Sequence, residues 1–513
     1  MAAANFEKET TFSTFQELFE LDERFRKALH AGLQKFLWNG TATKNHPNAK
    51  KNIQLAGSAI EGATLARVFQ KNDEFPSGLN QEIEVDIEYC LFQIPEDKKH
   101  LVKEIDSEQG FVQIEFTKDL INDSISIGWN VDKEDFEEYY GELISLGGFL
   151  KPFRAKQIAQ QKVAFQDVDN EYPLLFGAMF GVPKCDIKVE NLACEVTKSS
   201  VASEILVKVK EEPKLKISFD TVIIVKLAWQ SQIAKDWLRR PKNWPSYAIC
   251  EQLMKSGSYV IPKPSKKNKL HLDTTEMRYA FSQTERELVK LRSQNQNFVY
   301  MVFKIMFVKW IKPIDTEEIS SFIAKTAMFW IAEEFPPGDS VWDVFDEDSL
   351  LLPLQILFSW LLSTFESGFV PYYFNVKINI IAGVSGMTKE LVITKMEEIL
   401  NDMRQFLLSD MHQELELCKD VTIKVDNFGQ IFTMIKNKDY ISLLQHLPPE
   451  LCLDALKHFN ENPRKYERYT AATEENDKES FNENVNVVVE NENCSTTQEI
   501  EYEVKEFFKK FHQ

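Results

Sequence analysis

Eight consecutive residues, Glu82 to Tyr89, alternate strictly between polar and apolar side chains. This alternation is typical of a β-strand, because successive side chains of a strand point to opposite faces of the sheet. Glu84 and Asp86 then share one face of the strand, and the aliphatic residues between them share the other. The sequence therefore predicts a sheet in which one strand carries a row of carboxylates.

Around this strand the hydrophobic pattern predicts an α+β protein with two lobes. Further strands are expected at Asn52–Ser58 and within Ile205–Val225, and a long amphipathic helix, capped at Thr14, is expected to run to about Trp38. Helical spacing dominates after Pro245, which predicts a mixed N-lobe and a helical C-lobe braced by the N-terminal helix. The predicted helices cover residues 279–292, 298–311, 317–334, 350–365 and 388–407. We expect domains at 1–245 and 246–462, followed by an acidic tail, 463–513, that does not order itself.

Composition narrows the functional class. The 513 residues carry a net charge of −19, which argues against a protein that coats polyanions in general but leaves room for a local basic patch. The seven cysteines are scattered without a Cys-x-x-Cys pair, so we expect reduced thiols, no structural zinc and a cytoplasmic location. The most apolar stretch, 350–365, is too short to cross a bilayer, and we expect no membrane association.

Three acidic residues stand out as candidate metal ligands. Glu84 and Asp86 lie one residue apart on a strand, and Asp220 lies within an apolar strand, where a lone charge is costly unless it is paired or bound to a metal. Carboxylate oxygens suit Mg²⁺, and three converging carboxylates could hold two metal ions. The alternative is that Glu84, Asp86 and Glu88 form the solvated face of an edge strand.

The order of these residues adds a family resemblance. Gly57-Ser58 ends one predicted strand and opens a predicted helix, and the Glu-x-Asp pair and the later Asp follow in turn. This order resembles the polymerase-β-like nucleotidyltransferases. Within them the chain is similar to the Mab-type family, especially the cyclic GMP-AMP synthase-like receptors. The segments that carry this similarity begin at Gly57, Glu84, Ile217, Tyr259, Arg278, Ser320 and Phe365, and together they span roughly residues 10 to 420.

The resemblance implies a bilobed nucleotidyltransferase that uses Mg²⁺ or Mn²⁺ to make a cyclic dinucleotide from ATP and GTP. It further implies an activating ligand such as double-stranded RNA, and signalling in innate immunity through a STING-type receptor. Glu84, Asp86 and Asp220 match the catalytic metal-binding acids, and Ser58 matches a serine that contacts the triphosphate. The remaining nucleotide-binding positions implied by the match are Lys263, Arg278, Ser282, Glu285 and Lys325.

Departures from the family pattern leave the nucleobases and the trigger open. Residues 288–312 contain no Cys or His, whereas the vertebrate DNA sensor of this family has a zinc-binding insert there. Ala280 and Gly368 replace residues that contact a base in the family. Two alternatives remain: a synthase of linear oligonucleotides, and a catalytically silent member that binds nucleotide or RNA. The candidate basic residues for a nucleic-acid surface are Arg24, Lys27, Lys35, Lys50, Lys51, Arg154, Lys156, Arg239, Arg240, Lys242, Lys263, Lys266, Lys267 and Lys269.

Overall fold

The structure is a computed structural model of the whole chain. It describes residues 12–28, 53–70, 82–105, 110–120, 140–155, 187–191, 203–209, 216–255, 257–263, 274–407 and 413–422. For some strand residues, Glu84 and Asp220 among them, the description covers the backbone alone. The predicted acidic tail lies outside the described residues.

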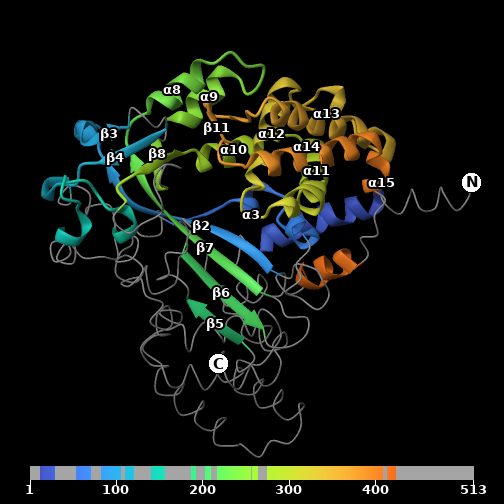
Figure 1. Cartoon of the computed structure of the whole chain (residues 1–513), viewed down its shortest axis with the longest axis horizontal. Helices are drawn as coiled ribbons and strands as arrows, with labels where there is room; N and C mark the ends of the chain where they lie inside the picture. Colours follow the sequence, from blue (N-terminus) through green and yellow to red (C-terminus); the bar gives the residue numbers. More distant parts are fainter. Residues whose placement is uncertain are drawn as a thin grey trace, which may run out of the picture.

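A nine-stranded mixed sheet forms the centre of the molecule (Figure 1). Its main path runs β1-β2-β7-β8-β9-β4-β3, and β6 pairs with β7 and carries β5 at its outer edge. β2 and β7 pair in parallel, while the other pairings are antiparallel. The strands are β1 (Ile53–Ala56), β2 (Glu82–Ile94), β3 (Val102–Glu104), β4 (Phe111–Ile114), β5 (Ile187–Asn191), β6 (Ser203–Val209), β7 (Lys216–Leu227), β8 (Ser258–Pro262) and β9 (Met277–Ala280).

The alternating segment forms β2, as predicted, and β2 lies between β1 and β7. The alternative that it is an edge strand is therefore wrong. Ile223, Ile224 and Val225 of β7 are all buried, although neighbouring residues point to opposite faces. A central strand that is covered on both faces reads as a continuous apolar run, which explains the pattern seen in the sequence.

The helices from α10 to α15, called here the helical part, lie on one side of β2 and β7 (Figure 1). Four of the five helical segments predicted after residue 245 are confirmed with shifted ends, while the first is confirmed in part, because Tyr279 and Ala280 belong to β9. β8 and β9 also follow residue 245, so the predicted domain boundary does not coincide with the edge of the sheet. The helices are α8 (Gln232–Arg239), α9 (Tyr247–Met254), α10 (Ser282–Leu291), α11 (Gln294–Met306), α12 (Phe322–Glu334), α13 (Glu347–Glu366), α14 (Gly386–Asn401) and α15 (Met403–Leu407), and a two-stranded ribbon, β10 (Pro371–Tyr372) and β11 (Asn375–Asn379), follows α13.

Helix α13 is long and apolar enough by composition to cross a membrane. Its apolar stripe is nevertheless used inside the protein: Leu354, Phe358 and Leu361 have no exposed surface, and the ring of Phe358 packs edge-on against Phe303 of α11. This burial agrees with the prediction of a core helix.

An amphipathic helix at residues 12–28 packs against the helical part. Its Phe12 and Phe19 side chains meet the ring of Phe298 edge-on, with centroid distances of 5.8 and 5.7 Å. The helix already includes residues 12 and 13, so Thr14 is not its N-cap, and the predicted extension to Trp38 lies outside the described residues. A second helix, 413–422, reaches it through an ion pair of 3.0 Å between Lys419 and Glu17.

Candidate active site

Asp86 of β2 lies directly against the backbone of Gly57. Gly57 has φ +61° and ψ −154°, a conformation that is essentially restricted to glycine. A Cβ placed on Gly57 would lie only 1.7 Å from Oδ2 of Asp86. Glycine is therefore required at position 57 for two reasons. Its backbone conformation is unfavourable for other residues, and a side chain there would collide with the Asp86 carboxylate.

The strand register brings the three candidate metal acids to neighbouring positions. Asp86 pairs with Asp220 in the parallel β2–β7 ladder, and it pairs with Ala56 on the β1 side. Glu84 is two residues from Asp86 on the same strand and pairs with Ser218. Residues at these positions belong to one face of the sheet. Among the side chains that the structure describes, no group of three metal-ligating residues occurs, and those of Glu84 and Asp220 are outside that description.

The chain after Ser58 does not continue as the helix that we predicted. α3 (Ser58–Glu61) is a single turn, and the backbone then changes direction at Gly62, with φ +101°, and Ala63, with φ +60°. A short 3-10 helix, η2 (Leu65–Phe69), follows. The turn is closed locally, because the Thr64 hydroxyl donates to the Ser58 carbonyl at 2.8 Å.

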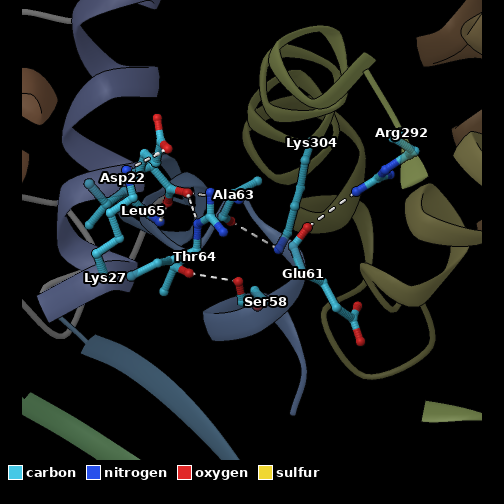
Figure 2. A network of polar contacts seen from close by, with 11 residues as sticks. Asp22, Lys27, Ser58, Glu61, Ala63, Thr64, Leu65, Arg292 and Lys304 are labelled. Atoms are coloured by element: carbon cyan, nitrogen blue, oxygen red, sulfur yellow. Dashed lines mark hydrogen bonds and ion pairs between the residues drawn. The ribbon is translucent and has the colours of Figure 1, made fainter. Parts of the chain in front are cut away.

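A buried carboxylate from the N-terminal helix holds this turn, as Figure 2 shows. Asp22 is 1% exposed, and its carboxylate accepts hydrogen bonds from the backbone N–H groups of Ala63 at 3.0 Å and Leu65 at 2.8 Å. Arg26, one helical turn further on, donates to the same carboxylate at 2.9 Å. Asp22 thereby satisfies two backbone donors that the buried turn would otherwise leave unpaired.

Two cations hold the turn from the opposite side (Figure 2). The Lys304 ammonium of α11 donates to the Ala63 carbonyl at 3.0 Å, and the Arg292 guanidinium donates to the Glu61 carbonyl at 3.2 Å. Burial lowers the pKa of Lys304 to about 8, although Asp22 and Glu61 act in the opposite direction. Burial also lowers the pKa of Arg292, to about 10. The turn after Ser58 is thus fixed between the N-terminal helix and the helical part.

The row of acids on β2 continues into the protein interior. Glu88, two residues beyond Asp86, is 6% exposed, so the alternative of a solvated face does not hold for this residue. Burial raises the pKa of the Glu88 carboxyl to about 7, and the Ser282 hydroxyl and the Arg286 charge, both on α10, oppose that rise. α10 therefore lies near the end of the row, and it carries Ser282, a predicted nucleotide-binding residue.

Lys325 and Glu285 form a buried ion-pair cluster with Glu61. The Lys325 ammonium of α12 lies 2.9 Å from Glu61 Oε2 and 2.5 Å from Glu285 Oε2. Arg278 lies close enough to Glu285 for its charge to oppose the burial-driven rise in the pKa of that carboxyl. The Tyr372 hydroxyl donates to Glu285 Oε1 at 3.4 Å. The structure thus gathers Arg278, Glu285 and Lys325 beside the turn that follows Ser58.

Lys263 directly follows β8, the strand beside β9. Ile261 of β8 pairs with Arg278 of β9, so Lys263 is two residues along the chain from a direct neighbour of the Arg278 position. It is half-buried. The pairing of β8 with β9 therefore places the Lys263 backbone close along the sheet to Arg278.

Several basic residues of the predicted nucleic-acid surface already bind other groups of the protein. Arg240 forms a two-pronged ion pair with Glu333, at 2.6 and 2.8 Å, and lies 4.4 Å from the centre of the Trp330 ring. Lys242 donates to the carbonyls of Trp237 and Arg240. Lys27 pairs with Glu23 at the surface. The remaining basic candidates that lie outside the described residues are Lys35, Lys50, Lys51, Lys156, Lys266, Lys267 and Lys269.

Four residues of the site were missed from the sequence: Asp22, Glu61, Arg292 and Lys304. One signal was available, since Lys304 is the single charged residue in the otherwise apolar run from Phe298 to Phe307. The others contact backbone groups or partners that are distant in the sequence, and such contacts leave no local pattern.

Comparison with known proteins agrees with the geometry. Residues 85–291 match the family model described as the Mab-21 protein nucleotidyltransferase domain. The chain is also similar to a cyclic GMP-AMP synthase-like receptor from Ctenocephalides felis, with 22% identity over 171 residues. That alignment covers 33% of this chain and 36% of the relative, so it spans about a third of each. Residues 85–291 are therefore similar to a Mab-21 nucleotidyltransferase domain, and the relative found supports the same resemblance over about a third of the chain.

Proposed function

We propose that this protein transfers a nucleotidyl group from one nucleoside triphosphate to the ribose hydroxyl of a second nucleotide. The observation that carries the proposal is the packing of Asp86 against Gly57, directly before Ser58, with Asp220 opposite Asp86 in the register. A carboxylate beside a serine at a tight turn is suited to a triphosphate with its divalent cation. The match of residues 85–291 to a nucleotidyltransferase domain supports the same reaction class.

In this proposal Glu84, Asp86 and Asp220 would hold Mg²⁺ or Mn²⁺. A divalent cation bound there neutralises phosphate charge and lowers the pKa of the attacking hydroxyl. Ser58 would contact the triphosphate of the donor. Asp220 would lie nearest the acceptor hydroxyl, which attacks the α-phosphate and displaces pyrophosphate.

The acceptor nucleotide would be oriented by the cluster at β9 and α10. Arg278, Ser282 and Glu285 offer a cation, a hydroxyl and a carboxylate from one strand-to-helix turn, which is the set of groups that can read the edge of a base and a sugar. We propose that Lys263 lies near a nucleotide as well, and that Lys325 acts at the same nucleotide site through its contacts with Glu61 and Glu285. These roles extend the family resemblance to individual residues of this chain.

We further propose that the product is a cyclic dinucleotide made from ATP and GTP, formed when the linear intermediate re-enters the site for a second transfer. Double-stranded RNA would be the activating ligand, and a STING-type receptor in the cytoplasm would read the product. The similarity to a cyclic GMP-AMP synthase-like receptor supports this finer proposal. A linear oligonucleotide synthase and a silent nucleotide-binding protein remain its rivals.

One experiment separates the three. Purified protein is incubated with labelled ATP, GTP, CTP and UTP and with Mg²⁺ or Mn²⁺, in the presence and absence of double-stranded RNA. Products are resolved after phosphatase treatment. A phosphatase-resistant dinucleotide supports the cyclic product, and a ladder of longer chains supports the linear synthase. Bound nucleotide without any product, under every ligand tried, supports the silent protein.

The RNA component has its own test. If RNA binds through phosphate contacts, its affinity must fall steeply as the salt concentration rises, because binding releases counterions. An affinity that does not change between 50 and 200 mM salt contradicts RNA as the trigger.

A further inference from the structure

Lys325 bridges two segments of the candidate site that are far apart in the sequence. Its ammonium contacts Glu61, in the turn after Ser58, and Glu285, on the helix that carries the predicted base-reading groups. All three side chains are largely buried: that of Lys325 is 15% exposed, and those of Glu61 and Glu285 are 4% and 5% exposed. Because the same ammonium contacts both segments, a shift of one segment disturbs the position of the other.

One ammonium contacts both carboxylates, and Arg278 acts on Glu285 through its charge from nearby. Burial acts to lower the pKa of Lys325, but Glu285 and Glu61 outweigh it and hold that pKa well above its ordinary value. Burial raises the pKa of Glu285, and Lys325 opposes the rise. Without the ammonium, two buried carboxylates would face each other, and like charges in such a site repel strongly.

Glu61 is held at both ends. Its carboxylate contacts Lys325, and its backbone carbonyl accepts a hydrogen bond from Arg292 at 3.2 Å. Ser58 lies three residues earlier in the same helical turn, so a displacement of Glu61 moves the whole turn. Glu285 is held by Lys325 on one oxygen and by the Tyr372 hydroxyl on the other.

We propose that Lys325 is a positioning residue, which fixes the turn after Ser58 relative to Glu285 by sharing its ammonium between Glu61 and Glu285. It acts on the reaction through these two carboxylates rather than by contact with substrate phosphate. Two of its three N–H donors are already directed at carboxylates, and the ammonium also lies 5.1 Å from the centre of the Phe322 ring. This inference rests on the proposed nucleotidyl transfer. It specifies how the turn after Ser58, proposed to contact the donor, is fixed relative to Glu285, proposed to contact the acceptor.

The test is a charge-rescue series made in the full chain. Lys325→Met removes the ammonium with little change in shape, Lys325→Arg keeps the charge, and a double variant combines Lys325→Met with Glu61→Gln. If Lys325 positions the carboxylates, kcat falls about 100-fold in Lys325→Met, because the freed carboxylates repel and displace the turn. The double variant recovers at least about tenfold of that loss, because one of the two charges has been neutralised.

Binding of inorganic tripolyphosphate separates positioning from direct phosphate contact. The proposal predicts that Lys325→Met binds tripolyphosphate within about twofold of the wild type, since the lysine does not touch phosphate. Weaker tripolyphosphate binding in Lys325→Met, with no recovery in the double variant, overturns the proposal. Wild-type kcat and thermal stability in Lys325→Met would also overturn it.

A matched control is available on the same helix. Glu333 of α12 pairs with Arg240, and the two side chains are 10% and 18% exposed, so this is another largely buried ion pair. Glu333→Gln is expected to lower thermal stability without the loss of kcat, which shows that a general weakening of α12 does not reproduce the effect of Lys325→Met. A loss of kcat in Glu333→Gln equal to that in Lys325→Met contradicts a specific role for Lys325.

The series remains informative if nucleotidyl transfer itself is absent. In that case wild-type protein shows no turnover, which refutes the proposed function, and the positioning claim is judged from unfolding alone. The effects of Lys325→Met and Glu61→Gln on the unfolding equilibrium must then be non-additive by at least about tenfold. Additive effects would refute the bridge between the two carboxylates.

Discussion

Replacement of Gly57 by alanine tests the close approach of the Asp86 carboxylate to the turn before Ser58. The new Cβ would lie 1.7 Å from Asp86 Oδ2, which is far inside van der Waals contact. Either the carboxylate or the turn must retreat by more than about 1 Å, and a displacement of that size at a reacting centre costs about 100-fold in rate. The backbone adds a second penalty, since φ +61° and ψ −154° cost a non-glycine residue about 1–3 kcal/mol.

We therefore expect Gly57→Ala to lose about 100-fold in kcat and about 1–3 kcal/mol in the free energy of unfolding. Turnover is measured as product formation from labelled nucleotides, and stability by urea denaturation. Gly338→Ala is the matched control, because Gly338 has φ +96° and a Cβ there would meet nothing within 4 Å. It should lose stability but keep its turnover. A Gly57→Ala protein with wild-type kcat would refute the argument that Asp86 depends on this glycine.

Three further predictions follow from the contacts around the site. Asp22→Ala leaves the buried N–H groups of Ala63 and Leu65 unpaired, at a cost of about 1–3 kcal/mol for each group. We expect the free energy of unfolding in urea to fall by at least about 2 kcal/mol, and a fall below about 0.5 kcal/mol contradicts the role given to Asp22. Arg240→Met leaves the buried Glu333 carboxylate without its ion-pair partner and should lower the free energy of unfolding by about 3–5 kcal/mol. Addition of Glu333→Leu should restore most of that stability, and a double variant as unstable as Arg240→Met shows that the ion pair is not the cause. The pKa of Lys304 is about 8 when folded and 10.5 ordinarily, so the unfolded chain binds more protons between these values. Relative to a Lys304→Met variant, wild-type stability should therefore rise from pH 8 to pH 10 by up to about 3 kcal/mol in chemical denaturation, and parallel curves would contradict the buried charge.

The sequence predicts the strands of the site better than the turn that follows Ser58. The alternation from Glu82 to Tyr89 predicts a strand with one acidic face, and the apolar run around Asp220 predicts a second strand. Both segments form strands, and their parallel register places Asp86 opposite Asp220. These features are local, and the hydrophobic period encodes them directly.

The turn after Ser58 could not be derived in the same way. Its composition from Ser58 to Arg67 suits a helix, yet the chain breaks at Gly62 and adopts φ +60° at Ala63, which is a costly conformation for a residue with a side chain. Hydrogen bonds from distant segments stabilise that conformation: Asp22 accepts from Ala63 N–H, and Lys304 donates to its carbonyl. Such tertiary contacts override local helix propensity, and a single sequence does not display them.

Lys325 illustrates the same limit for function. The family resemblance implies that it meets a phosphate, while the structure places its ammonium between two buried carboxylates. The nucleotide-binding role stays a prediction, and the charge-rescue series decides between contact and positioning. Spacing along the chain gave no indication of the pairing, because Glu61 and Lys325 are 264 residues apart.

The most direct test of the central claim is the release of pyrophosphate from nucleoside triphosphates by wild-type protein and by Asp86→Asn, with Mg²⁺ or Mn²⁺ and with double-stranded RNA present. The account predicts release by the wild type and a loss of at least about 100-fold in Asp86→Asn, because the variant keeps the shape of the side chain and removes the charge that would hold the metal. Thermal stability measured in parallel should change little. Equal rates of pyrophosphate release from the two proteins would contradict the claim that Asp86, packed against Gly57, is a catalytic metal ligand.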